Sequence, residues 1–231
     1  MSATTSARLT TTVAREFVLA LAGVGLVLFI FMHLSGNLLI YAGPEHFNAY
    51  SAKLHELGAL LWVARIGLIA AFGAHAALGL DLALRNRRAR KNRYAEYTYM
   101  SDKTLATRTM AISGLLIFFF IWIHLYDFTL SDHSGSYSIV DGMNDGASLG
   151  LYGVVFNTFS NPLHALFYIV VMVALGMHLS HALSSVFVTL GSENSPFVSR
   201  METVAKAVAT LVSLGFISIP IYILVRAHLA G

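Results

Sequence analysis

Five long apolar segments constrain this chain more than any other feature of its sequence. They cover residues 17–41, 58–84, 107–130, 161–190 and 204–226. Each reaches the ~20 residues that a helix needs to cross the ~30 Å hydrocarbon core of a membrane. Backbone polar groups inside a bilayer must be satisfied within the protein, and apolar runs without polar alternation satisfy them as α-helices. We therefore expect an all-α bundle of five transmembrane helices.

The composition agrees with a membrane protein and narrows its chemistry. Only 12% of the 231 residues are charged, whereas soluble domains carry about 25%. The chain has no cysteine, which excludes disulfides, thiolate-bound iron–sulfur clusters and covalently attached c-type haem. Its first segment is too long for a signal peptide, and no linker or repeat divides the chain, so we expect one domain over residues 1–231. Pro220 should kink the last helix, because it removes a backbone donor.

The distribution of basic residues predicts the orientation. Seven Lys and Arg residues lie in 85–104, whereas the loops at 42–57 and 131–160 contain only Lys53. Cytoplasmic loops are enriched in Lys and Arg, so the N-terminus should lie in the cytoplasm and the C-terminus outside. The basic segment would contact anionic lipid or dock a soluble partner; nucleic-acid binding is not expected of so short a loop.

Four histidines occupy matched positions on the first four segments. They are His33, His75, His124 and His178. Each lies roughly 17 residues into its segment, hence ~25 Å along a helix that rises about 1.5 Å per residue. Because successive helices run in opposite directions, His33 and His124 should lie together near the outer face. His75 and His178 should lie together near the inner face.

Two histidine pairs at two depths are typical of two stacked b haems, each with two axial histidines. A lone intramembrane histidine usually bonds a neighbouring helix, but four at matched depths favour metal binding. Pairs at different depths cannot give one zinc ion four ligands. We expect Gly36, Gly79 and Ala174 to give clearance for the macrocycles. Haem with two axial histidines has no open position, which favours electron transfer over oxygen binding.

The stretch MHLSHALSSVFVTLG (177–191) places a glycine thirteen residues after His178. With the five segments and the four histidines, it resembles the di-haem cytochrome b558-type membrane anchor of succinate dehydrogenases and fumarate reductases. The resemblance covers nearly the whole chain. His181, one turn from His178, is the alternative ligand in the fourth segment. His164 is the other histidine there, but it lies near the outer end, at the wrong level to pair with His75.

The resemblance implies a subunit of a bacterial succinate:quinone oxidoreductase of the tricarboxylic acid cycle, in the cytoplasmic membrane. Such an anchor holds two haem b groups, binds a flavoprotein and an iron–sulfur subunit, and passes electrons to menaquinone or ubiquinone without carrying the dehydrogenase site itself. The complex can form a higher oligomer. Relatives use an acidic residue near the outer haem to exchange protons with quinone, and Glu56, beside His55, is the best match. Some relatives carry a glutamate where this chain has Gly176, which puts that proton pathway in doubt.

Further polar residues are candidates for contacts with the haem propionates. Arg65, in the outer half of the second segment, needs an anion, and an outer propionate fits; nearby Trp62 is an expected interfacial anchor. On the inner side, four residues are candidates for propionate or quinone contacts, although residues of these types are also common at helix ends: Arg15, Asp81, His181 and Ser185. Asp127, one turn after His124, could transfer protons or orient a haem ligand.

Two other functions remain open at this point. One is a di-haem cytochrome b of another respiratory complex, although one ligand on each helix favours the succinate enzyme. The other is a transporter without haem, whose histidines relay protons or bind a metal ion. The segment 131–150 reads as an exposed acidic loop or cap, and it lacks the spacing of a calcium loop.

Overall fold

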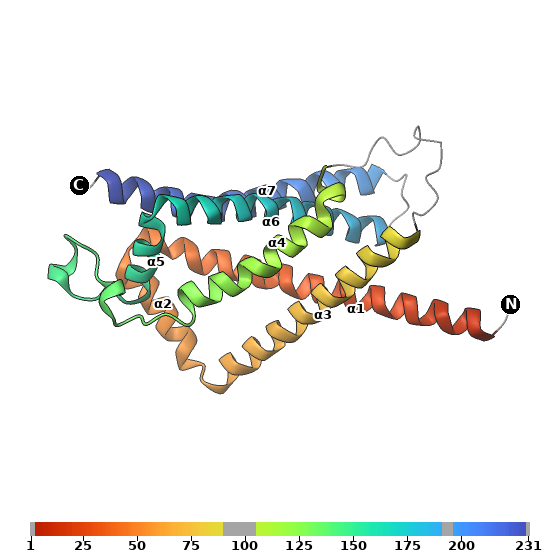
Figure 1. The fold of residues 1–231 in the computed structure, drawn as a ribbon, viewed down its shortest axis with the longest axis horizontal. Helices are drawn as coiled ribbons and strands as arrows, with labels where there is room; N and C mark the ends of the chain where they lie inside the picture. The colour runs from red at the N-terminus through yellow and green to blue at the C-terminus, as the bar shows by residue number, and fades with distance from the viewer. Residues whose placement is uncertain (1–2, 90–104, 191–195, 230–231) are drawn as a thin grey trace.

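The computed structural model describes residues 3–89, 105–190 and 196–229, and within them the long secondary-structure elements are helices (Figure 1). Its α-helices are α1 Ala3–Asn37, α2 Pro44–Glu56, α3 Ala59–Ala89, α4 Leu105–Phe128, α5 Gly150–Ser160, α6 Pro162–Leu190 and α7 Pro196–Leu229. A short 3-10 turn, Leu38–Ala42, joins α1 to α2.

Five of these helices, α1, α3, α4, α6 and α7, are long and apolar enough to cross a membrane. This confirms the predicted all-helical chain with five candidate spans and indicates a multi-pass membrane protein. Pro220 lies inside α7, which continues to Leu229. Most of the predicted basic loop, from residue 90 to 104, lies outside the described residues.

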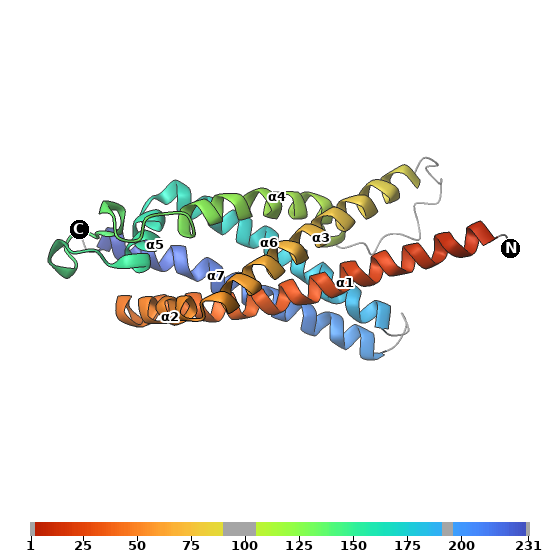
Figure 2. The same cartoon turned by 90° about the horizontal axis from the view of Figure 1, so that it is seen from below.

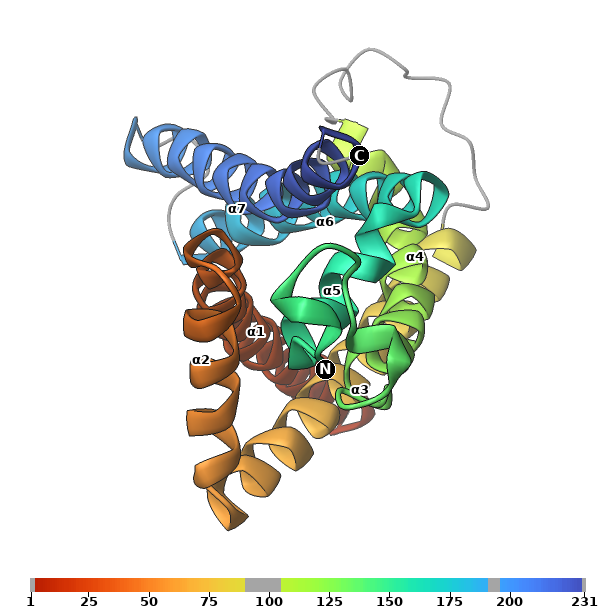
Figure 3. The same ribbon diagram turned by 90° about the vertical axis from the view of Figure 1, so that its left-hand side faces the viewer.

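The long helices pack unequally. α6 packs along α7 and also contacts α4, α1 packs along α3, and α3 and α4 meet over a shorter length. Seen from one end, α1, α3, α4 and α6 are arranged around a common centre, and α7 lies on the outer side of α6 (Figure 3). None of the residues in the most apolar window of α3 is buried within the chain. The four helices that carry the predicted ligands therefore enclose the part of the bundle with the least direct helix packing.

Two short helices and a folded loop form a cap at the end of the bundle where α7 finishes (Figures 1 and 2). We call this the cap end; it comprises α2, residues 129–149 and α5. Asn48 of α2 joins its parts, since its Nδ2 donates to the Leu149 carbonyl at 2.8 Å and its Oδ1 accepts from the Tyr152 N–H at 3.1 Å. Tyr152 is 1% exposed, and burial raises the pKa of its hydroxyl.

The sequence predicted an exposed loop or a cap for 131–150, and in the structure this segment is part of the cap. Ser138 and Val140 are buried. Asn157 of α5 donates from Nδ2 to the carbonyls of Tyr137 and Ile139 at 2.8 and 2.7 Å. A Cβ at Gly153 would collide with the Ser138 carbonyl, so only glycine lets α5 lie this close to the loop.

Candidate metal centre

The first histidine pair joins α1 and α4 near the cap end. The rings of His33 and His124 have centroids 5.6 Å apart and stand nearly perpendicular, at 89°. Asn37, one turn after His33, donates from Nδ2 to the His33 carbonyl at 2.7 Å. The same amide nitrogen lies 3.3 Å from both ring nitrogens of His33. We call His33 and His124 the cap-end pair.

The second histidine pair joins α3 and α6 further from the cap. The rings of His75 and His178 have centroids 6.3 Å apart at 71°. Nδ1 of His178 lies 3.2 Å from the Ser113 hydroxyl of α4, and this contact orients the imidazole ring. When that hydroxyl donates to the Met110 carbonyl, 3.0 Å away, it accepts from Nδ1–H of His178. The Nε2 atom of neutral His178 then carries the free lone pair that a metal requires.

Both pairs have the separation expected of rings that share one metal ion. A metal–imidazole bond is about 2 Å long, so two rings that face each other across one ion have centroids roughly 6 Å apart. The Nδ1 atom of His124 is buried without a hydrogen-bond partner in the described part of the chain. A buried polar atom without a partner costs about 1–3 kcal/mol. The residues present therefore fit a group that binds between the rings of each pair.

Two glycines locate the second pair relative to the first. A Cβ on Gly23 of α1 would lie 3.4 Å from Cε1 of His75, and one on Gly114 of α4 would lie 3.2 Å from Cε1 of His178. Gly23 precedes His33 by ten residues, and Gly114 precedes His124 by ten. At about 1.5 Å per residue, both helices give a separation of ~15 Å between the two pairs along the bundle.

These are not the glycines that the sequence analysis selected. A Cβ on Gly36 would collide with the ring of Tyr50, so Gly36 makes room for α2 rather than for a macrocycle. Gly79 has open space around it, and Ala174 is buried. Gly23 and Gly114 were missed, although their equal separation from a ligand histidine on alternate helices was a signal present in the sequence.

Aromatic rings surround the cap-end pair. Phe29 stacks on His33 with centroids 5.3 Å apart, and Phe120 stacks on His124 at 5.6 Å. Between the levels of the two pairs, Phe72 of α3 stacks on Phe118 of α4 at 5.7 Å. Such surroundings exclude water and lower the local dielectric, which tunes the potential of a metal centre.

The cationic residues expected near propionates have different partners. Arg15 of α1 and Arg85 bind the Asp81 carboxylate of α3 at 3.4 and 2.9 Å, which makes a bridge between the two helices. Arg65 lies over the ring of Trp62 at 5.1 Å, and no carboxylate pairs with it in the described part of the chain. Arg65 is therefore the residue of this group that keeps a charge available for an anion.

On α6, the two remaining propionate candidates lie at and beyond the level of His178. Ser185 is exposed and donates to the Ala182 carbonyl at 2.8 Å, and His181 is half-buried. Both belong to the half of α6 further from the cap.

The quinone candidates His55 and Glu56 lie at the exposed end of α2. His55 places Nδ1 2.8 Å from the Ser51 carbonyl within its own helix. Neither side chain has a hydrogen bond or ring contact with the cap-end pair in the described residues. The corner between α2 and α3 projects away from α6 and α7 (Figures 1 and 3). The structure thus does not bring these two residues to the histidines.

A different polar cluster lies beside the cap-end pair. The Asp127 carboxylate, on the turn of α4 that follows His124, lies 2.8 Å from Nε2 of His164. The same oxygen, Oδ2, accepts from the Tyr168 hydroxyl at 2.6 Å. The side chain of Asp127 is only 12% exposed. His164, which the sequence analysis placed at the wrong level to pair with His75, is thus bound to a carboxylate.

The described residues contain no group of three or more His, Asp or Glu side chains that could hold a metal ion. The candidate metal ligands on this part of the chain are therefore the two facing histidine pairs. Comparison of the chain with protein-family models, curated proteins and solved structures gave no match in any of the three.

Proposed function

We propose that this chain is the di-haem cytochrome b membrane anchor of a succinate:quinone oxidoreductase. The proposal rests on two pairs of facing histidines on four different membrane-type helices. The ring centroids are 5.6 Å apart in one pair and 6.3 Å apart in the other. One haem b would be held by His33 and His124 and the other by His75 and His178. Haem iron with two axial histidines supplies reversible one-electron transfer.

The residues of the chain prepare each site for that role. Ser113 hydrogen-bonds Nδ1 of His178, and Gly23 and Gly114 leave room beside the rings of the second pair. The aromatic rings around His33 and His124 keep water away. Two such sites ~15 Å apart would let an electron pass between the two membrane surfaces through one haem and then the other.

The basic segment at 85–104 supports an orientation with the cap end outside the cell. The second pair would then lie nearer the cytoplasm, where the iron–sulfur subunit of the enzyme would dock and deliver electrons. The flavoprotein would bind to that iron–sulfur subunit. The quinone would exchange electrons with the haem of the cap-end pair, in a bacterial cytoplasmic membrane.

A reduced-minus-oxidised absorption spectrum of the purified chain tests the haem assignment. We expect a b-type spectrum and two haems per chain by pyridine haemochrome assay. A purified, folded chain without a b-type band would contradict both cytochrome functions and favour a transporter with histidines that relay protons.

Purification of the chain with its bound partners tests the enzyme assignment. We expect it to retain a flavoprotein that oxidises succinate, together with an iron–sulfur subunit. Two haems in a complex that lacks succinate-oxidising flavin would instead indicate a cytochrome b of another respiratory enzyme.

A further inference from the structure

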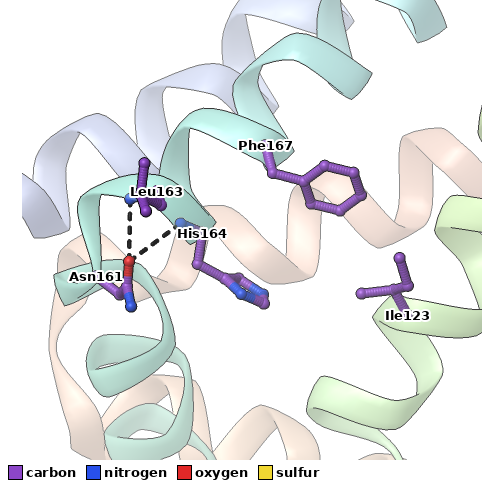
Figure 4. Close-up of a pocket in the computed structure, with 5 residues that line it drawn as sticks. All are labelled: Ile123, Asn161, Leu163, His164 and Phe167. Atoms are coloured by element: carbon purple, nitrogen blue, oxygen red, sulfur yellow. Dashed lines mark hydrogen bonds between the residues drawn. The ribbon is translucent and has the colours of Figure 1, made fainter.

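A groove of about 360 Å³ opens at the cap end between α4 and α6 (Figure 4). Its lining residues are Ile123, Asn161, Leu163, His164 and Phe167. Three of the five are apolar, and His164 is the only ionisable one. The volume falls within the ~300–1,000 Å³ typical of small-molecule pockets.

The imidazole of His164 has one nitrogen fixed by the chain and one available. Its Nε2 lies 2.8 Å from Oδ2 of Asp127, so the N–H of the neutral ring points at the carboxylate. Its Nδ1 has no hydrogen-bond partner in the described part of the chain. That atom can accept a bond from a ligand hydroxyl, or donate one to a ligand carbonyl when the ring is protonated.

The other polar side chain of the groove is already engaged. Oδ1 of Asn161 accepts from the backbone N–H groups of Leu163 and His164, at 3.0 and 3.3 Å (Figure 4). The groove therefore offers a ligand one strong polar contact, at His164, and otherwise apolar walls. The carboxylate of Asp127 behind the imidazole disfavours an anionic head group, such as a phosphate.

The groove is connected to the cap-end pair by packed rings. Tyr168 stacks on His164 with centroids 5.3 Å apart and lies 6.2 Å from the ring of His124. Ile123, on the wall of the groove, directly precedes His124 in the chain. A ring bound at His164 would thus be one side chain away from a proposed haem ligand.

From this geometry we infer that the groove binds the head group of a membrane quinone, with one ring oxygen hydrogen-bonded to Nδ1 of His164. A quinone is a neutral, flat, lipid-soluble ring that alternates between carbonyl and hydroxyl oxygens, which matches apolar walls and a histidine able to donate or accept. The inference rests on the proposed function and replaces His55 and Glu56 as the quinone contacts.

Photolabelling of the intact complex with an azidoquinone tests the site. We expect the label on peptides that contain residues 161–167. His164→Ala should weaken quinone binding about tenfold, as the loss of one hydrogen bond to a chargeable group predicts. Leu163→Trp should also reduce labelling, because Leu163 is 78% exposed and a larger side chain there would fill the groove without altering the hydrogen bonds. His228→Ala is the matched control, since exposed His228 bonds only the Leu224 carbonyl within α7.

Label found instead on residues 44–58, or unchanged labelling in both the His164→Ala and Leu163→Trp complexes, would overturn the inference. Haem spectra recorded on the same samples separate this outcome from failure of the proposed function. A complex with two haems and a quinone bound elsewhere contradicts the groove alone, whereas a chain without haem contradicts the proposed function itself.

Discussion

The hydroxyl of Ser113 and the imidazole of His178 form a hydrogen-bonded pair across two helices. The Ser113 oxygen lies 3.2 Å from Nδ1 of His178 and 3.0 Å from the Met110 carbonyl oxygen. Nδ1 of His178 is therefore engaged by α4, which leaves Nε2 as the ring nitrogen for a metal.

Ser113→Ala should weaken the second haem site while leaving the cap-end site intact. Partners that orient a metal-bound histidine typically contribute 10–100-fold in affinity. Potentiometric titration of the two haems should therefore show a shifted or partly lost component assigned to His75 and His178. Ser184→Ala, which removes a hydroxyl bonded only to the Ser180 carbonyl in α6, should leave both components unchanged. Equal effects of the two variants would contradict the role of Ser113.

Replacement of single histidines should remove haems by pair. His33→Ala and His124→Ala should each lower the pyridine haemochrome count from two haems to one, with loss of the same redox component. His75→Ala and His178→Ala should each remove the other component. If His181→Ala removes a haem while His178→Ala retains both, the ligand assigned on α6 is wrong.

Gly23→Val should damage the site whose ligands lie on other helices. A Cβ there would already lie 3.4 Å from His75, and the additional methyl groups of valine would press on that ring. We expect loss of the haem held by His75 and His178, although Gly23 belongs to the helix that carries His33. Gly25→Val, where a Cβ meets nothing within 4 Å, is the control. The spectrum of each purified variant measures the effect, and loss of the His33 haem from Gly23→Val would contradict the geometry.

Asn48→Ala should loosen the cap. The change leaves the Leu149 carbonyl and the Tyr152 N–H without their side-chain partner, and each lost bond to a buried group costs about 1–3 kcal/mol. Thermal unfolding in detergent should show a lower midpoint than for His55→Ala, which removes only the bond of an exposed side chain to the Ser51 carbonyl of its own helix. An unchanged midpoint for Asn48→Ala would show that α2 and α5 are held by apolar packing alone.

The five long helices were predictable because apolar runs of this length have one stable form in a membrane. The pairing of His33 with His124 and of His75 with His178 followed from depth along antiparallel helices. A cap was one of the two interpretations of 131–150, but the helices α2 and α5 were not predicted, since they are too short to span a membrane and their apolar residues, such as Tyr152, carry no recognisable period. The contact between Asp127 and His164 depends on how α4 and α6 pack, and their separation in sequence gave no sign of it.

Gly176 illustrates the same limit. In the family that the chain resembles, some members carry a glutamate at this place. In the structure a Cβ at Gly176 would lie 2.8 Å from Cβ of Ser213 on α7. The position therefore belongs to the tight contact between α6 and α7, and a long side chain there would separate the two helices.

Gly23 precedes His33 by ten residues, and Gly114 precedes His124 by ten. Because each helix carries one histidine of the cap-end pair and one glycine beside the second pair, the position of α1 or α4 along the bundle affects both pairs. A slip of either helix by one turn, about 5.4 Å, would withdraw a ligand from one centre and push a side chain into the other. Partly misassembled bundles would thus lose both centres together rather than one. Cofactor insertion would then act as a check on membrane assembly, since only a bundle with correct register could retain either group.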